Sequence, residues 1–130
     1  MKKGYKITSK SESKSLILLR DLVIKRIKKK YPNFNTDLSQ LHKFVDINEI
    51  NKLRLDIFNY LNNKIPWTDI ISDISHNDIA IEIGRDMLIQ SKINLSIQMP
   101  NDQSSVLSAH SDCWSSDSPF QINLWIPLTN

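Results

Sequence analysis

The period of the hydrophobic pattern changes at Gly84, and this change constrains the fold more than any other feature of the chain. Before Gly84, apolar residues recur every three or four positions, as on one face of an α-helix. After Gly84 they alternate with polar residues, as on one face of a β-strand. The alternating apolar positions are Met87, Ile89, Ile93, Leu95, Ile97 and Met99, and then Phe120, Ile122, Leu124, Ile126 and Leu128. Helices first and strands second predict an α+β fold, with helices packed on one face of a mainly antiparallel sheet.

Three helical stretches are expected in the first half of the chain. Residues 16–30 carry an apolar stripe and stop before a Tyr-Pro pair, because the residue before a proline is pushed out of the helical region. Residues 38–44 predict a short helical turn. Asp46 and Glu49 are spaced as a capping box, and we expect them to open a helix that runs to about Asn62.

The stretch from Trp67 to Gly84 is ambiguous in sequence. Residues 67–75 fit either a helical turn or a loop with buried anchors. Residues 78–83 fit a helix capped by Asn77 and ended by Gly84 in a left-handed conformation. They also fit a strand, because isoleucines alternate at 79, 81 and 83.

Length and charge limit the class of protein. The chain has 130 residues and a net charge of +3, which suits one domain or part of one. We expect residues 1–14 to form a polar, basic arm and residues 15–130 to form a single domain. Cys113 is the one cysteine in the sequence, so an internal disulfide is impossible and a cytoplasmic location is expected. No apolar run approaches the roughly 20 residues that cross a bilayer, so no membrane association is expected.

The tripeptide His110-Ser111-Asp112 lies between the two alternating stretches. A histidine and an aspartate two residues apart point to the same side of an extended chain. One imidazole nitrogen and one carboxylate oxygen are two-thirds of the facial triad that holds non-haem Fe(II). The alternative is a surface turn in which Asp112 caps the following amides and His110 is solvated.

Three motifs around this tripeptide carry a family resemblance. Residues 94–100 are NLSIQMP, residues 110–120 are HSDCWSSDSPF, and residues 125–128 are WIPL. In this order they resemble the sporadic carbohydrate cluster 2-oxoglutarate/Fe(II) oxygenases, a family within the phytanoyl-CoA-dioxygenase-like group. The resemblance covers about the last third of the chain, and the helical part carries no motif of the family.

The resemblance implies a fold and a site. The fold would be a double-stranded β-helix, or jelly roll, with the helices packed outside it. His110 and Asp112 would be the first two Fe(II) ligands, and Gln98 or Asn94 would bond the 2-oxoglutarate, with Trp125 as a wall of its pocket. The reaction would couple 2-oxoglutarate decarboxylation to oxidation of a small substrate, and the family points to a sugar or nucleotide-sugar in carbohydrate biosynthesis.

The family pattern also includes a distal histidine and an arginine that pairs with 2-oxoglutarate. The chain ends at Asn130 before either appears, and fewer strands are expected than the eight or so that close a barrel. We therefore expect the N-terminal portion of an oxygenase domain, inactive alone, whose C-terminal half is missing.

Two other classes of function remain open from the sequence. One is a non-catalytic binding module derived from such a domain. The other is a small basic protein that associates with nucleic acid through its lysine-rich N-terminal region. Aromatic residues do not interleave with those lysines, so nucleic acid is not expected as a partner.

Overall fold

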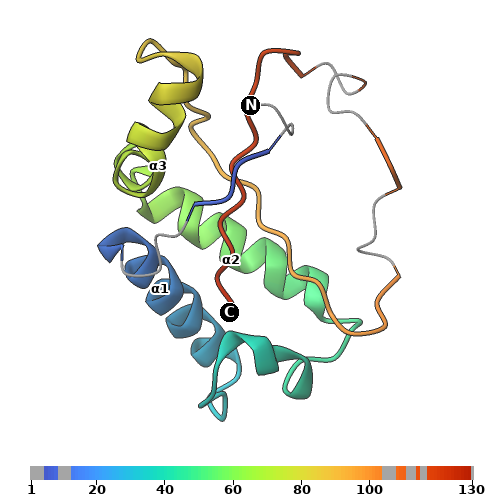
Figure 1. Cartoon of the computed structure of the whole chain (residues 1–130). Coiled ribbons are helices and arrows are strands. Elements are labelled where there is room, and N and C mark those ends of the chain that lie inside the picture. The colour runs from blue at the N-terminus through green and yellow to red at the C-terminus, as the bar shows by residue number, and fades with distance from the viewer. Residues whose placement is uncertain (1–4, 9–12, 104–107, 111–113, 115–116, 130) are drawn as a thin grey trace.

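The computed structural model describes residues 5–8, 13–103, 108–110, 114 and 117–129 of the chain. Within these ranges the secondary structure is helical (Figure 1). The helices are α1 (Lys14–Lys30), the 3-10 helix η1 (Leu38–Lys43), α2 (Ile50–Lys64) and α3 (Trp67–Ile83).

The prediction of an α+β jelly roll is wrong for the described chain. Residues 93–99 and 121–128 are extended, but neither stretch forms a strand in the part that the structure describes. A strand requires a ladder of backbone hydrogen bonds to a neighbour, whereas alternation of apolar residues requires only a surface on one side. Here the surface is supplied by the helices.

The apolar stripe of α1 forms one side of the core, as predicted. Its buried residues are Leu16, Leu19, Val23 and Ile27. Ser13 caps the helix through a 3.4 Å hydrogen bond from the amide of Leu16 to its hydroxyl. Tyr31 ends the helix, with its N–H bonded to the carbonyl of Ile27 at 2.8 Å. This position of the end confirms the boundary expected before the proline.

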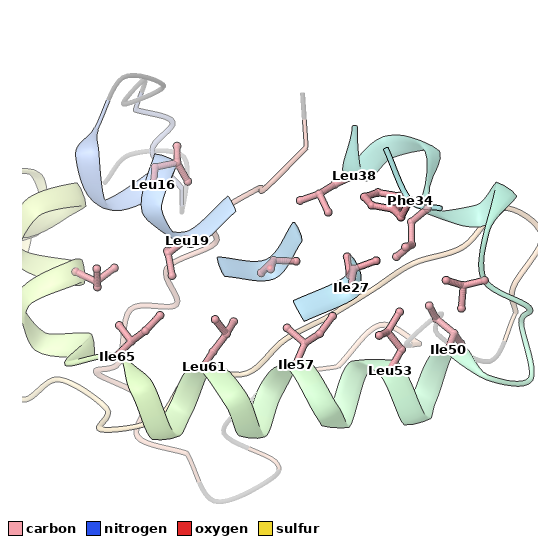
Figure 2. Close-up of a cluster of buried hydrophobic side chains, with 14 of the residues drawn as sticks. Leu16, Leu19, Ile27, Phe34, Leu38, Ile50, Leu53, Ile57, Leu61 and Ile65 are labelled. Atoms are coloured by element: carbon pink, nitrogen blue, oxygen red, sulfur yellow. The ribbon is translucent and has the colours of Figure 1, made fainter. Parts of the chain in front are cut away.

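Helix α2 packs its apolar face against α1 and the segment that contains η1. Its buried residues are Ile50, Leu53, Ile57 and Leu61, and Figure 2 shows them pointing toward Ile27, Phe34 and Leu38. Ile27, Leu53 and Ile57 are completely buried. These are the sites where removal of a side chain leaves a cavity and costs most stability.

The start of α2 differs from the predicted capping box. The helix begins at Ile50, and Glu49 makes no side-chain cap. Asp46 instead accepts a 2.8 Å hydrogen bond from the amide of Asn48, which is a local turn. Ile47 is 44% exposed because it lies in this turn, outside the helix.

Helix α3 joins two stretches that the sequence left separate. It runs without a break from Trp67 to Ile83, and Asn77 lies within it instead of capping a new helix. Gly84 ends it, with φ 94° and ψ 173°. The φ value lies in the positive region that favours glycine, although the ψ value is not that of a left-handed helix. Helix α1 contacts both α2 and α3, so α1 is the central element of the core.

All the buried apolar side chains that the structure describes lie between Leu16 and Ile74. The chain after α3 returns over these helices in two extended segments, which are orange and red in Figure 1. Their apolar residues are partly buried against the helical core, namely Ile93, Leu95, Ile97, Met99, Ile126 and Leu128.

Candidate functional site

The first extended segment is attached to α2 by one side chain. The amide of Asn62 accepts from the backbone N–H of Ile93 at 2.9 Å and donates to the carbonyl of Ile93 at 3.2 Å. Asn62 also donates to the carbonyl of Phe58 within α2, at 3.0 Å. The paired bonds to Ile93 are the exchange that a neighbouring strand would otherwise make.

The second extended segment is attached to α1. The Nε of Arg20 donates a 3.1 Å hydrogen bond to the carbonyl of Leu128. Neither attachment is predicted by the sequence. Asn62 lies near the expected end of a helix, and no local pattern distinguishes Arg20 from the other basic residues of the N-terminal region.

A tight turn follows the first segment. The amide of Asp102 bonds the carbonyl of Met99 at 3.1 Å, and Asn101 has φ 64°. Proline at the second position and a positive φ at the third fit a type II turn, and asparagine tolerates that conformation. Asp102 is buried, with 7% of its surface exposed.

His110 is exposed and oriented by its own backbone neighbourhood. Its Nδ1 lies 2.7 Å from the carbonyl oxygen of Ser108. A carbonyl only accepts, so Nδ1 must carry the hydrogen, and in the neutral ring the lone pair is on Nε2. A backbone carbonyl on one ring nitrogen is the usual means of orienting a histidine that binds metal through the other.

The rest of the predicted metal site is outside what can be described. Asp112, its neighbour Cys113 and Ser111 all lie outside the residues that the structure describes. Among the residues that are described, no group of three or more His, Cys, Asp and Glu side chains is arranged to hold a metal ion. The described chain therefore supplies one candidate ligand, His110, with a donor atom of the right type.

The residues predicted to contact 2-oxoglutarate lie on the outer face of the extended segments. Asn94 and Gln98 are exposed and share one side of the first segment. Trp125 is on the second segment and is 80% exposed. The half-buried apolar residues of each segment pack on the helices, so the polar positions between them face away from the core. Their contact with a cosubstrate stays a prediction.

Two other histidines provide a comparison with His110. His42, in η1, is also exposed, and its Nδ1 lies 3.1 Å from the carbonyl of Ser39. His76 is half-buried on α3. The local orientation of His110 is therefore shared with His42. What distinguishes His110 is the aspartate two positions later and the surrounding motifs.

No family model matches the chain, and neither the curated proteins nor the solved structures that were searched include a match. The likeness to 2-oxoglutarate oxygenases thus rests on the motif residues alone. None of the helices in the described ranges combines the length and apolar character that a bilayer crossing needs.

Proposed function

We propose that this chain carries two ligands, His110 and Asp112, of a non-haem Fe(II) site that belongs to a 2-oxoglutarate-dependent oxygenase. The proposal rests on the order of the three motifs in residues 94–128.

The orientation of His110 is the structural observation that most supports the proposal. The bond from Nδ1 to Ser108 fixes the tautomer in which Nε2 is the donor atom for a metal. A neutral imidazole and a carboxylate suit Fe(II) and leave other positions for further ligands. With Fe(II) and 2-oxoglutarate bound, such a site couples decarboxylation of the 2-oxo acid to oxidation of a substrate.

The roles of the chain in this proposal are to bind and to orient. His110 and Asp112 hold the metal, and the Ser108 carbonyl sets the ring of His110. Asn94 and Gln98 offer amide groups to the carboxylate of 2-oxoglutarate, and Trp125 offers a flat apolar surface beside them. The substrate proposed is a small molecule related to a sugar or nucleotide-sugar, by the family resemblance.

Titration with Co(II), an air-stable substitute for Fe(II), tests the ligands directly. We expect His110→Ala and Asp112→Ala each to weaken Co(II) binding by about tenfold or more, followed by the visible absorption of the ion. His42→Ala is the matched control, because His42 has the same exposure and a similar local contact. If His110→Ala bound Co(II) like the wild type, His110 would not be a ligand.

The cosubstrate is tested in the same titration. If the proposed site takes a 2-oxo acid, 2-oxoglutarate will tighten Co(II) binding to the wild type and have no such effect on Asp112→Ala. Succinate, which lacks the 2-oxo group, is the control ligand. Equal effects of the two acids would contradict the assignment of 2-oxoglutarate.

A non-catalytic binding module is the second candidate, and the exposed aromatic side chains favour it. Phe120 is 89% exposed and Trp125 is 80% exposed, on a segment that Arg20 holds on α1. Large exposed aromatic side chains are typical of surfaces that bind a partner. Retained binding of a partner by His110→Ala, together with no metal binding by the wild type, would favour this candidate. For either function we propose a cytoplasmic location, because the sequence offers no disulfide.

A further inference from the structure

A small open cavity lies at the C-terminal end of α1. Its volume is about 310 Å³, at the lower end of the range of small-molecule sites. It is lined by Arg26, Lys29 and Lys30 of α1 and by Asp56 of α2. Three cationic side chains thus converge on one space against a single carboxylate.

The pair between Arg26 and Asp56 gives the cavity a fixed wall. Nε of Arg26 donates to Oδ2 of Asp56 at 2.7 Å, and Nη2 donates to Oδ1 at 2.5 Å. The guanidinium also lies over the ring of Tyr60, 5.1 Å from its centroid. This fork uses two of the five N–H donors of arginine, so the guanidinium keeps donors for another acceptor.

Asp56 lies beside both lysines as well as Arg26 in the lining of the cavity. The hydrogen bond from Arg26 is the main reason that the pKa of the Asp56 carboxyl is lowered. Burial opposes this hydrogen bond by raising the pKa, and the charges of Arg26, Lys30 and Lys29 each lower the pKa by a smaller amount. The carboxylate is therefore ionised at neutral pH, and one negative charge faces three positive ones.

The two lysines differ in their other contacts. Nζ of Lys30 lies 3.5 Å from Oε2 of Glu49, so its charge is partly neutralised. Lys29 is exposed and makes no ion pair within the described residues. An incoming anion would thus meet the unpaired ammonium of Lys29 and the guanidinium of Arg26 first.

Stabilisation of the helix dipole does not explain this arrangement completely. Lys28, Lys29 and Lys30 all lie in the last turn of α1, where cations interact favourably with the helix end. Lys28 has that position without lining the cavity. The convergence of Arg26, Lys29 and Lys30 around Asp56 is a further property, and it is typical of a site for an anion.

We propose that this cavity binds the phosphate group of a small phosphorylated molecule. Arg26 offers planar donors for phosphate oxygens, and Lys29 and Lys30 supply mobile ammonium groups. A small molecule is favoured over nucleic acid because the carboxylate of Asp56 interrupts the cationic lining of the cavity. Arg26, Lys29 and Lys30 are all partly or fully exposed, so phosphate binding is expected to weaken as salt is added.

An NMR titration of the whole chain with inorganic phosphate tests the site. Ionic strength is held constant with chloride, and backbone amide shifts are followed. We expect the largest shifts at residues 26–30 and 56, and we expect Lys29→Gln to weaken binding by about tenfold, the loss of one charge-assisted contact. Lys28→Gln is the matched control, with the same charge change in the same turn, and should bind phosphate like the wild type.

Three outcomes would overturn the proposal. One is the absence of phosphate-dependent shifts at residues 26–30 and 56. Another is an equal loss of binding in Lys28→Gln and Lys29→Gln, which would indicate a diffuse positive field. The third is tighter binding of a single-stranded oligonucleotide than of phosphate, with an equal loss of oligonucleotide affinity in both variants. That result would indicate a nucleic-acid surface. Lys28 and Lys29 are both exposed, so both variants should keep the circular dichroism of the wild type.

Discussion

Single side chains take the place of strand neighbours in this molecule. The amide of Asn62 makes paired hydrogen bonds with the backbone of Ile93, and Arg20 bonds the carbonyl of Leu128. Both contacts join residues far apart in sequence, and both satisfy backbone groups of a segment without a ladder. The position of the extended segments therefore depends on a few polar side chains as well as on apolar burial.

Loss of the Asn62 amide should release the first extended segment. We expect Asn62→Ala to lower the free energy of unfolding by about 1–2 kcal/mol, because two bonds to Ile93 and one to Phe58 are lost. Chemical denaturation measures this change. Asn63→Ala is the matched control, since Asn63 is the next residue and is exposed. Equal stability of the two variants would mean that the Asn62 contacts contribute nothing.

The ion pair of Arg26 and Asp56 predicts a dependence of stability on pH. Its hydrogen bond lowers the pKa of Asp56 below the ordinary value of 3.8. A lowered pKa in the folded state stabilises the fold above the unfolded value, and this contribution is lost as pH falls through the folded pKa. Both side chains are partly exposed, so the effect is about 1 kcal/mol or less.

Thermal unfolding between neutral and acid pH measures this contribution. We expect Asp56→Asn to be less stable than the wild type at neutral pH, and the difference to shrink at pH values below about 4. Asp21→Asn is the control, because Asp21 is exposed on α1 and has no ion pair in the described ranges. A difference that did not change with pH would contradict an ionic contribution from Asp56.

At the scale of elements, the buried faces of the helices were predictable from the sequence. The strands expected after Gly84 are not formed in the described residues. Residues that recur every three or four positions, such as Val23 and Ile57, have one buried face whatever their neighbours are. Alternation is less specific. Ile97 is half-buried and Gln98 is exposed, as a strand pattern predicts, yet an extended segment on a helical surface buries every second residue in the same way.

Local sequence patterns also do not predict that α3 is one continuous helix. Asn77 has the chemistry of an N-cap, and the isoleucines at 79, 81 and 83 have the period of a strand. In the structure Ile81 is 77% exposed and Ile83 is 45% exposed, so alternation there reports no buried face. Burial of Trp67, Ile70 and Ile74 against α1 fixes the helix, and this tertiary contact is absent from any local signal.

The candidate sites also include one feature that the sequence predicts and others that only the structure shows. The histidine was found by its motif, and its orientation by the Ser108 carbonyl is a structural observation. The cavity beside Asp56 had no signal in sequence, because it requires the register between α1 and α2. In the sequence, the lysines of that turn are part of a lysine-rich N-terminal region and nothing distinguishes them from the other lysines.

At the scale of the whole molecule, the helical core and the extended segments differ in burial. The accessible surface of the chain is 9887 Å², whereas a compact protein of 15.1 kDa exposes about 7,100 Å². The buried apolar residues come from the helices, and the extended segments contribute only half-buried ones. The helices should thus be the more stable unit.

Limited proteolysis should separate these two parts. Arg85 and Lys92 are exposed in the segment that follows α3. We expect trypsin to cleave there first and to leave a helical fragment that resists further digestion, as followed by mass spectrometry. Cleavage within α1 or α2 at the same rate would contradict an independent helical core.

The most direct test of the proposed metal site is to locate a bound ion. Mn(II) broadens the NMR signals of nearby residues, and substoichiometric Mn(II) can be added to the whole chain. We predict that the amide signals of residues 108–112 broaden first and that His110→Ala removes the effect, whereas His42→Ala leaves it unchanged. Broadening centred on the acidic side chains of α3, such as Asp69 and Asp73, with no effect of His110→Ala, would contradict an iron site at His110 and Asp112.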